Sequence, residues 1–503
     1  MRPLISLPEV TVHVGGAPLD AAWARALDGV RVQQRLSLPA QSVLVFTGDA
    51  DLLADRTPFE IGAALQVAVR GQRVPVFVGE VTALELQCGA DNRRSLIVRG
   101  YDRLHRLRKR QSVRAYVQMT PGDLARQMAA EVGLNVEVEQ DGALFEYLIQ
   151  HRQSDLDFVT DVAERSGLYL TIREHVLHLI TLAGQGDALN LRLGHELHQA
   201  QVELNADAAC TEVSALGWNA ARVEVFQGGV SSARSGRDVQ AALNTELLTG
   251  RVLVDLGAEL DAQIGGMAQA ELDRRSAAEV VMTGTAEGDT RLRPGTVVRV
   301  SGIARAFDGA YVLTSVNHII NQTVGFLSEL GTAPPPPRTR SSAAAVTLGV
   351  ITQINDPESL GRVRIALPTY NQVETDWVNV LSAGAGAGKG LMLLPEVGDE
   401  VLVLLAHEDP AQAVVLGGLY GRRGMPDAGI DDGAVRRFTL LTPGGQRVRL
   451  DDTNQLIRLE NSGGSFVELS PNKVHVHAAV DLEIEAPGQS IIVRGNTIDF
   501  QRG

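Results

Sequence analysis

An eight-residue repeat at the end of the 503-residue chain restricts the possible folds more than any other feature of its sequence. Apolar residues recur eight positions apart in two interleaved registers, and Ser490 interrupts the second. Shorter apolar-polar-apolar units precede them at 448–450, 457–459 and 467–469. Because apolar and polar residues alternate over so few positions, each unit is predicted to be a very short strand followed by a turn. The first register contains Val476, Ile484, Ile492 and Phe500, and the second contains Val474, Leu482 and Ile498.

Such short strands cannot cover their own apolar side, because the segment contains no helix and no second sheet. Several identical chains lying side by side would bury these residues on a common axis, as a three-sided β-prism does. The alternative is a monomeric β-solenoid, although solenoid rungs usually run to about 20 residues rather than eight. The expected prism core consists of Val474, Val476, Leu482, Ile484, Ile492, Ile498 and Phe500, and the outward residues are His475, His477, Glu483, Glu485 and Asp499.

A proline-rich linker at 333–345 divides the rest of the chain. Its four consecutive prolines cannot enter the interior of a helix or sheet, so an extended, stiff spacer is expected. The segment before it, 1–332, alternates in a strand-like way at 74–78, 95–99, 134–138, 168–172, 296–300 and 311–316. The overall prediction is a multidomain chain that is mainly β with some α.

Two helices within 1–332 have well-defined ends. The first begins at Thr120, has Pro121 in its first position and ends before Gly133. The second begins at Ser154, whose spacing to Asp157 is that of a capping box, and ends by Gly167. A third helix is predicted at 259–277.

The segment 346–425 is predicted to be a compact barrel. Five short apolar stretches are separated there by glycine and proline, which is typical of turns between strands. Five strands in about 80 residues suit an oligonucleotide/oligosaccharide-binding (OB) fold. The predicted strands are 346–354, 361–366, 378–382, 400–406 and 413–420.

Composition excludes several classes of protein. The net charge of −14 argues against nucleic-acid binding. Two cysteines cannot form a disulfide framework, and no apolar run approaches the ~18 residues of a membrane helix. Pro8 and Glu9 interrupt the N-terminal segment before a signal-peptide core can form. We therefore expect assembly in the cytoplasm, with neither a signal peptide nor a transmembrane segment.

The search for catalytic, cofactor and metal sites yields no convincing candidate. The pairs His175/His178 and His195/His198 lack the four-residue step of a zincin helix, and the glycine-rich run 384–390 lacks the Ser/Thr of a phosphate loop. The basic run 103–114 is interpreted as a solvated face or as a contact with an acidic neighbour. No catalytic residue, metal ligand or cofactor-binding residue is therefore predicted.

Several segments resemble the VgrG-like spike proteins of contractile injection systems, which are similar to a fusion of a phage tail hub and a tail spike. The stretch 394–403, Leu-Pro-Glu-Val-Gly-Asp-Glu-Val-Leu-Val, is the most specific of these segments. Matching segments of the hub lie at 100–107, 154–169, 292–295 and 316–318. In the OB segment, the residues that match the family motif are Gly361, Arg362, Trp377, Pro395, Gly398, Asp399, Glu400 and Gly417.

The resemblance implies a domain order and a set of partners. Residues 1–332 would form a tail-hub region of two β-barrels with an α/β insertion around 115–185, followed by the linker, the OB domain and a prism at 426–503. The implied assembly is a homotrimer that joins a hexameric inner tube and baseplate proteins to a PAAR-like tip protein. Phe500 and Gln501 are the expected seat of that tip. The resemblance also allows effector cargo as a further partner, and it implies that the spike contacts the target membrane when it punctures it.

The resemblance also separates the possible functions. Some phage spikes insert a lysozyme between barrel and prism, whereas only about 421–437 separates the two here. Some VgrG proteins carry a toxin after the prism, and this sequence ends at Gly503. A non-enzymatic, puncturing spike is therefore the favoured interpretation. The alternatives are a trimeric tail enzyme that acts on cell-surface polysaccharide and an adhesin that binds glycans through its OB barrel.

Overall fold

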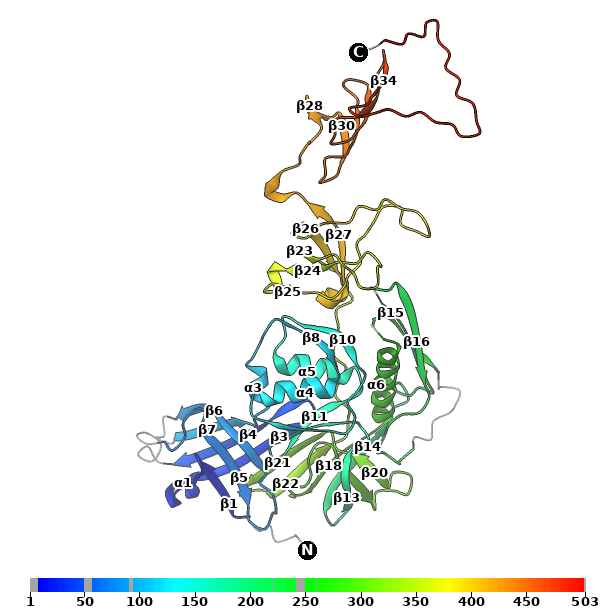
Figure 1. Ribbon diagram of the computed structural model, residues 1–503. Coiled ribbons are helices and arrows are strands. Elements are labelled where there is room, and N and C mark those ends of the chain that lie inside the picture. The colour runs from blue at the N-terminus through cyan, green and yellow to red at the C-terminus, as the bar shows by residue number, and fades with distance from the viewer. Residues whose placement is uncertain are drawn as a thin grey trace. The chain divides into compact units, whose positions relative to one another are not determined.

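The computed structural model describes residues 8–48, 57–89, 94–219, 221–240, 249–258 and 260–501. These residues form two compact units, Met1–Leu419 and Tyr420–Gly503, and each is described by itself (Figure 1). The fold class predicted from the sequence is confirmed: the structure is mainly β with a few helices.

An eleven-stranded sheet forms the base of the first unit. Its two halves come from distant parts of the sequence and are joined where β21 pairs antiparallel with β3, with Ile319 opposite Arg31. Separate apolar cores lie in the two halves, one around Trp23, Phe46 and Phe59 and the other around Met282 and Tyr311. The strand order is β14 (Leu197–Leu204), β18 (Val280–Glu287), β22 (Gly325–Gly331), β21 (Ser315–Asn321), β3 (Leu27–Arg35), β4 (Leu38–Gly48), β7 (Arg94–Tyr101), β6 (Phe77–Cys88), β5 (Ala64–Val69), β1 (Val10–Val14) and β2 (Ala17–Pro18).

Two small sheets and a long helix complete the second half. The sheet β13-β19-β20 packs with the second core, and the sheet β16-β15-β17 packs on α6. The prediction of one continuous strand at 311–316 is wrong, because these residues are divided between two strands that join different sheets. The third predicted helix is confirmed at Asp261–Glu279, although Glu259 lies outside the described residues. The elements are β13 (Gln185–Arg192), β15 (Val213–Asn219), β16 (Glu224–Val230), β17 (Arg251–Gly257), α6 (Asp261–Glu279), β19 (Thr296–Ser301) and β20 (Gly309–Val312).

The two capped helices lie in an α/β insertion with its own core. In α4 (Pro121–Ala130) the hydroxyl of Thr120 accepts from the backbone N–H of Asp123. The Asp123 carboxylate accepts from the backbone N–H of Thr120, so a complete capping box forms on this first helix. In α5 (Asp155–Glu164) the hydroxyl of Ser154 accepts from the backbone N–H of Asp157, so of the capping box predicted at this helix only the Ser154 half is found. The helices pack on β8 (Arg114–Met119), β9 (Asn135–Val138), β10 (Phe145–Gln150), β11 (Tyr169–Arg173) and β12 (Val176–Ile180).

A buried carboxylate fastens the insertion to the sheet. Asp102 follows β7 and is 5% exposed. One of its oxygens accepts from the backbone N–H of Ala40 at 2.8 Å, and the other accepts from that of Leu104 at 3.0 Å, just before α3 (His105–Arg108). Burial raises the pKa of Asp102 to about 7.

The OB segment is a five-stranded sheet in the order β25-β24-β23-β26-β27. Four of the five predicted strands are present, but 378–382 makes only isolated bridges, Val363 to Val378 and Val380 to Val415. The fifth strand is β25 instead. Strand β10, which pairs with β8, contributes Tyr147 and Ile149 to the barrel core, so the insertion and the barrel share buried surface. The strands are β23 (Ala345–Gln353), β24 (Arg364–Leu367), β25 (Val373–Glu374), β26 (Glu400–Leu405) and β27 (Ala413–Leu419).

The linker is extended, as predicted, but it is also fastened to the hub. Arg340 donates from Nε to Asp161 at 3.0 Å, and Arg338 contacts Asp157 at 3.3 Å and Glu164 at 3.5 Å. These carboxylates share one face of α5, because they are four and three residues apart. Arg165 and Arg340 hold the pKa of Asp161 well below its usual range against the opposing effect of burial, while burial raises the pKa of Glu164 to about 7.

A buried ion pair closes the first turn of the barrel. Arg362 is 5% exposed and donates from two nitrogens to Asp356, at 2.8 and 3.0 Å. Asp356 also accepts from the backbone N–H groups of Glu358 and Leu360. These donors, above all Arg362, hold the pKa of Asp356 well below its usual range.

The second unit contains a five-stranded antiparallel meander in sequence order, preceded by a two-stranded ribbon. No strand is found between His477 and Gln501, the last residue that the structure describes. The strands are β28 (Ile430–Asp431), β29 (Ala434–Val435), β30 (Arg437–Leu441), β31 (Arg447–Asp451), β32 (Leu456–Glu460), β33 (Phe466–Leu469) and β34 (Val474–His477).

We predict that Arg362→Met destabilises the barrel by about 3 kcal/mol, because it leaves the buried Asp356 carboxylate without its main partner. Hydrogen exchange of peptides from β23 and β24, followed by mass spectrometry, measures this locally. The matched control is Arg364→Met, whose partner Asp376 is far more exposed, so a loss below about 1 kcal/mol is expected. Equal effects of the two variants would contradict the prediction.

A second prediction concerns pH and Asp102. Its pKa is raised on folding, so below its ordinary pKa of 3.8 the group is protonated in both states and adds no pH dependence. Between 3.8 and about 7 the folded state must hold a proton that the unfolded state has lost, so folding becomes less favourable as pH rises. The melting temperature of the parent minus that of Asp102→Asn should therefore fall as pH rises from 4 to 7.5. A difference that is constant with pH would contradict this prediction.

Candidate assembly surface

The C-terminal meander carries an uncovered apolar face. Its register aligns two cross-strand rows, each made of one apolar residue from every strand. We call these ten residues the apolar face. They are Phe438, Leu450, Ile457, Leu469 and Val474 in one row, and Leu440, Val448, Leu459, Val467 and Val476 in the other.

Nine of these ten side chains are exposed, and Val448 is half-buried. Val474 and Val476, the first two residues of the expected prism core, are 68% and 55% exposed. The sequence analysis identified the units around 448–450, 457–459 and 467–469 but missed Phe438 and Leu440. The same apolar-polar-apolar pattern at 438–440 could have revealed them.

The opposite face of the meander is polar and internally paired. Arg458 donates to Glu460 at 2.9 Å and to Glu468 at 3.0 Å, and its guanidinium lies 3.9 Å from the centre of the Phe466 ring. His475 and His477 contact the same ring, with centroids 5.1 and 5.0 Å away. The side chains of this polar face therefore form ion pairs and ring contacts with one another. Among the described residues of the unit, the side chains of the apolar face have no comparable partners.

The remaining prism-core residues lie outside any strand in the single chain. Leu482, Ile484, Ile492 and Ile498 are all exposed, and Phe500 is 92% exposed. Gln501 donates from its side chain to Asp499 at 2.7 Å. The structure thus leaves the eight-residue repeats without a core of their own, and their packing remains a prediction.

The OB motif residues have structural roles. Gly361 adopts a φ of +75°, which favours glycine, and precedes the Arg362–Asp356 pair. In the turn before β26, Asp399 accepts from the backbone N–H of Glu396 at 2.8 Å, and Gly398 donates to the Ile351 carbonyl at 2.9 Å.

Other motif residues flank these turns. Arg364 lies over the ring of Trp377, 5.3 Å from its centroid. Pro395 lies in the long loop between β25 and β26, Glu400 begins β26, and Gly417 lies in β27 (Figure 1). The motif therefore organises the barrel rather than a reaction centre.

Three cations of the basic run 103–114 pair with carboxylates of the same chain, while Arg106, Arg108 and Lys109 are exposed, as expected of a solvated face. Arg106 contacts Glu80, Arg110 contacts Asp155 at 3.1 Å, and Arg114 contacts Glu131 at 3.1 Å. These acidic partners come from distant strands and helices, and local spacing does not reveal them.

The two histidine pairs and the glycine-rich run 384–390 lie in turns and strands. His175 lies in the turn of the β11–β12 hairpin rather than in a strand, and His178 lies 3.4 Å from Glu137. Within the described ranges, no group of three or more His, Cys, Asp or Glu side chains is placed to hold a metal ion. Gly386 and Lys389 pair in a small turn, with no helix after it.

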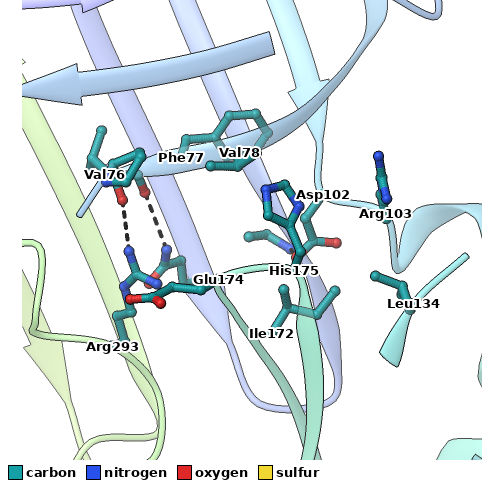
Figure 2. A pocket seen from close by; sticks show the side chains of 13 residues that line it. Val76, Phe77, Val78, Asp102, Arg103, Leu134, Ile172, Glu174, His175 and Arg293 are labelled. Carbon is teal, nitrogen blue, oxygen red and sulfur yellow. Dashed lines mark hydrogen bonds between the residues drawn. The ribbon is translucent and has the colours of Figure 1, made fainter. Parts of the chain in front are cut away.

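A small pocket of 50 Å³ lies between the sheet and the insertion (Figure 2). Arg293 donates to the Pro75 carbonyl at 2.7 Å, and Gln34 donates to the Val76 carbonyl at 3.5 Å. Asp102 already accepts two backbone N–H groups. Because these polar groups serve contacts within the chain, the pocket is better explained as part of the packing than as an active site.

In the part of the chain that the structure describes, no helix is both long enough and apolar enough to cross a membrane.

Comparisons with protein families cover most of the chain. Residues 8–322 match the model of the Alg8 N-terminal domain, and residues 347–420 match the type VI secretion system/phage-baseplate injector OB domain. A curated relative, the actin cross-linking toxin VgrG1 of Vibrio cholerae serotype O1, is 23% identical over 360 residues. That match covers 64% of this chain, which spans only 33% of the relative's length.

Solved structures share the fold at low sequence identity. The Escherichia coli protein c3393 is described as a type VI secretion component similar to the phage T4 tail proteins gp27 and gp5. It has a TM-score of 0.54 at 13% identity, over 81% of this chain and 99% of its own. The lidded PdpA–VgrG complex of Francisella has a TM-score of 0.56 at 8% identity, over 95% of this chain and 81% of that chain. Together with the two family matches, these likenesses confirm the resemblance found in the sequence. The chain belongs to the family of the Alg8 N-terminal domain, and its OB segment and its fold are similar to those of the VgrG-like spike proteins of contractile injection systems.

Proposed function

We propose that three copies of this chain form the central spike of a contractile, phage-tail-like particle. The apolar face of the C-terminal meander carries this proposal. Full burial of a valine, leucine, isoleucine or phenylalanine side chain stabilises a protein by about 1.5–3 kcal/mol, so ten such residues leave a large gain unrealised in the single chain. Three copies around one axis would bury all three apolar faces together.

The rest of the chain fits the hub end of such a spike. Two sheet halves, each with its own core, are joined in one eleven-stranded sheet. Three chains would present six such halves, which matches the symmetry of a hexameric inner tube. We propose that this end contacts the tube and baseplate proteins, while the C-terminal end, with Phe500 and Gln501, seats a PAAR-like tip protein.

We propose that the spike acts mechanically rather than as an enzyme. The polar groups of the small hub pocket and of the OB motif serve contacts within the chain, and energy would come from a contracting sheath. The glycan-binding alternative is less well supported, because Arg364 lies over a face of Trp377 on which a sugar ring would stack. Saturable glycan binding by the protein would revive that alternative.

The native mass is the first test. One chain has a mass of 53.8 kDa, so a trimer is expected near three times that value, about 161 kDa, by native mass spectrometry. Leu459→Asp, on the apolar face, should shift this trimer towards monomer by at least tenfold in dissociation constant, because a charge would enter the shared core. Arg449→Ser, on the opposite face of the same sheet, is the control and should leave the trimer intact. A stable 53.8 kDa monomer of the parent protein would refute the proposal.

Deletion from Asn472 onward tests the role of the repeats. This truncation removes β34 and every later eight-residue unit, so weaker trimers and loss of tip-protein binding are expected, while circular dichroism should show that the hub still folds. Phe500→Ser is the finer variant, for which tip binding should fall without a change in native mass. Unchanged tip binding by both variants would place the tip elsewhere.

A further inference from the structure

The OB sheet is apolar on both of its faces. Its inward residues, such as Ile351, Val401 and Val415, are buried in the barrel core. The outward residues are also apolar in cross-strand rows: Val346, Leu404 and Val414 form one row, and Leu348 and Leu402 begin the next. Antiparallel sheets that face water on one side usually alternate apolar and polar residues, so this outer face has the composition of a covered one.

The outer face is only partly covered in the single chain: Leu402, Leu404 and Val414 are half-buried, and the β23 end of each row is exposed. Val346 is 57% exposed and Leu348 is 51% exposed. Gly417 continues the row of Leu348 and Leu402, and no atom lies within 4 Å of the position that a Cβ would occupy there. The row therefore ends at Gly417, where no side chain lies beside Leu348 and Leu402. An apolar side chain from another molecule could pack there.

The same domain carries a protruding apolar segment. Leu391, Met392, Leu393, Leu394 and Val397 are each at least 51% exposed, and Met392 reaches 87%. They belong to the long loop between β25 and β26, which extends away from the barrel (Figure 1). Only Glu396 is charged between 391 and 397.

Backbone hydrogen bonds hold both ends of this segment. Leu391 donates to the Ala383 carbonyl at 2.9 Å, and Gly398 donates to the Ile351 carbonyl of β23 at 2.9 Å. Ile351 in turn donates to the Asp399 carbonyl at 3.0 Å. Because its base is anchored to the barrel, the segment is presented from a defined position instead of hanging freely.

We propose that residues 391–397 of one copy dock on the outer face of β23, β26 and β27 of the next copy around the trimer. A protrusion and a receiving face on one domain make a head-to-tail contact, and three such contacts close a ring. Each surface carries one carboxylate at its edge, Glu396 in the segment and Glu400 at the start of β26, and the side chains between them and the contact rows are apolar. This inference rests on the homotrimer proposed above and identifies a second interface within it, separate from the C-terminal meander.

Cross-linking of the full-length chain tests the contact directly. Cys88 is exposed and is first replaced by serine, while Cys210 is buried and stays. The double variant Met392→Cys/Leu348→Cys, treated with a short bifunctional maleimide, should give covalent dimers and trimers on a denaturing gel. Each single variant should give no covalent dimers or trimers. A head-to-tail contact brings residue 392 of one copy close to residue 348 of the next copy, and not close to residue 392 of that copy.

The control double variant is Met392→Cys/Val223→Cys. Val223 is 79% exposed but lies before β16 rather than on the OB sheet, so no cross-link is expected. Cross-linking of this control to the same extent, or of Met392→Cys alone, would overturn the head-to-tail contact. A native trimer that forms no 392–348 cross-link would overturn the inference and leave the proposed spike standing, whereas a native monomer would overturn both.

Discussion

The exposed apolar face of the C-terminal meander is the constraint on which the proposed architecture depends. A five-stranded sheet without a covering layer gains little from its apolar side chains, and small isolated sheets are only marginally stable in water. The polar side of the same sheet already has its own ion pairs and ring contacts around Arg458 and Phe466. The unsatisfied side is therefore the side on which association is favourable. Identical copies are the simplest partners, because each brings the same apolar rows in the same register.

The hub and the OB barrel show the opposite arrangement, in which one chain supplies its own partners. Asp102 joins the sheet to the insertion, Arg340 fastens the linker to α5, and Tyr147 enters the barrel core from the hub. These contacts fix the barrel against the hub within the first unit. A spike that transmits force needs such a rigid junction, because a free linker would bend before the tip could advance.

Much of the fold could be predicted from the sequence, since it depends on local patterns. The N-cap residues Thr120 and Ser154 define where two helices begin, and apolar alternation identifies most of the OB strands. The strand predicted at 311–316 failed because the chain turns between two sheets there, and periodicity does not show which sheet a residue joins. The strand predicted at 378–382 failed because its residues make only single bridges, one to Val363 just before β24 and one to Val415 in β27.

The sequence by itself determined that the last part of this protein repeats a short pattern of apolar and polar residues, which forms strands as far as His477. Only the tertiary structure decided which residues stand opposite one another. The cross-strand register gathers Phe438, Ile457 and Val474 into one row, and chain reversal brings Glu131 to Arg114. The physical reason is that local spacing determines which side of a strand a residue faces, whereas its partner across the sheet is determined by turns and packing far away in the sequence.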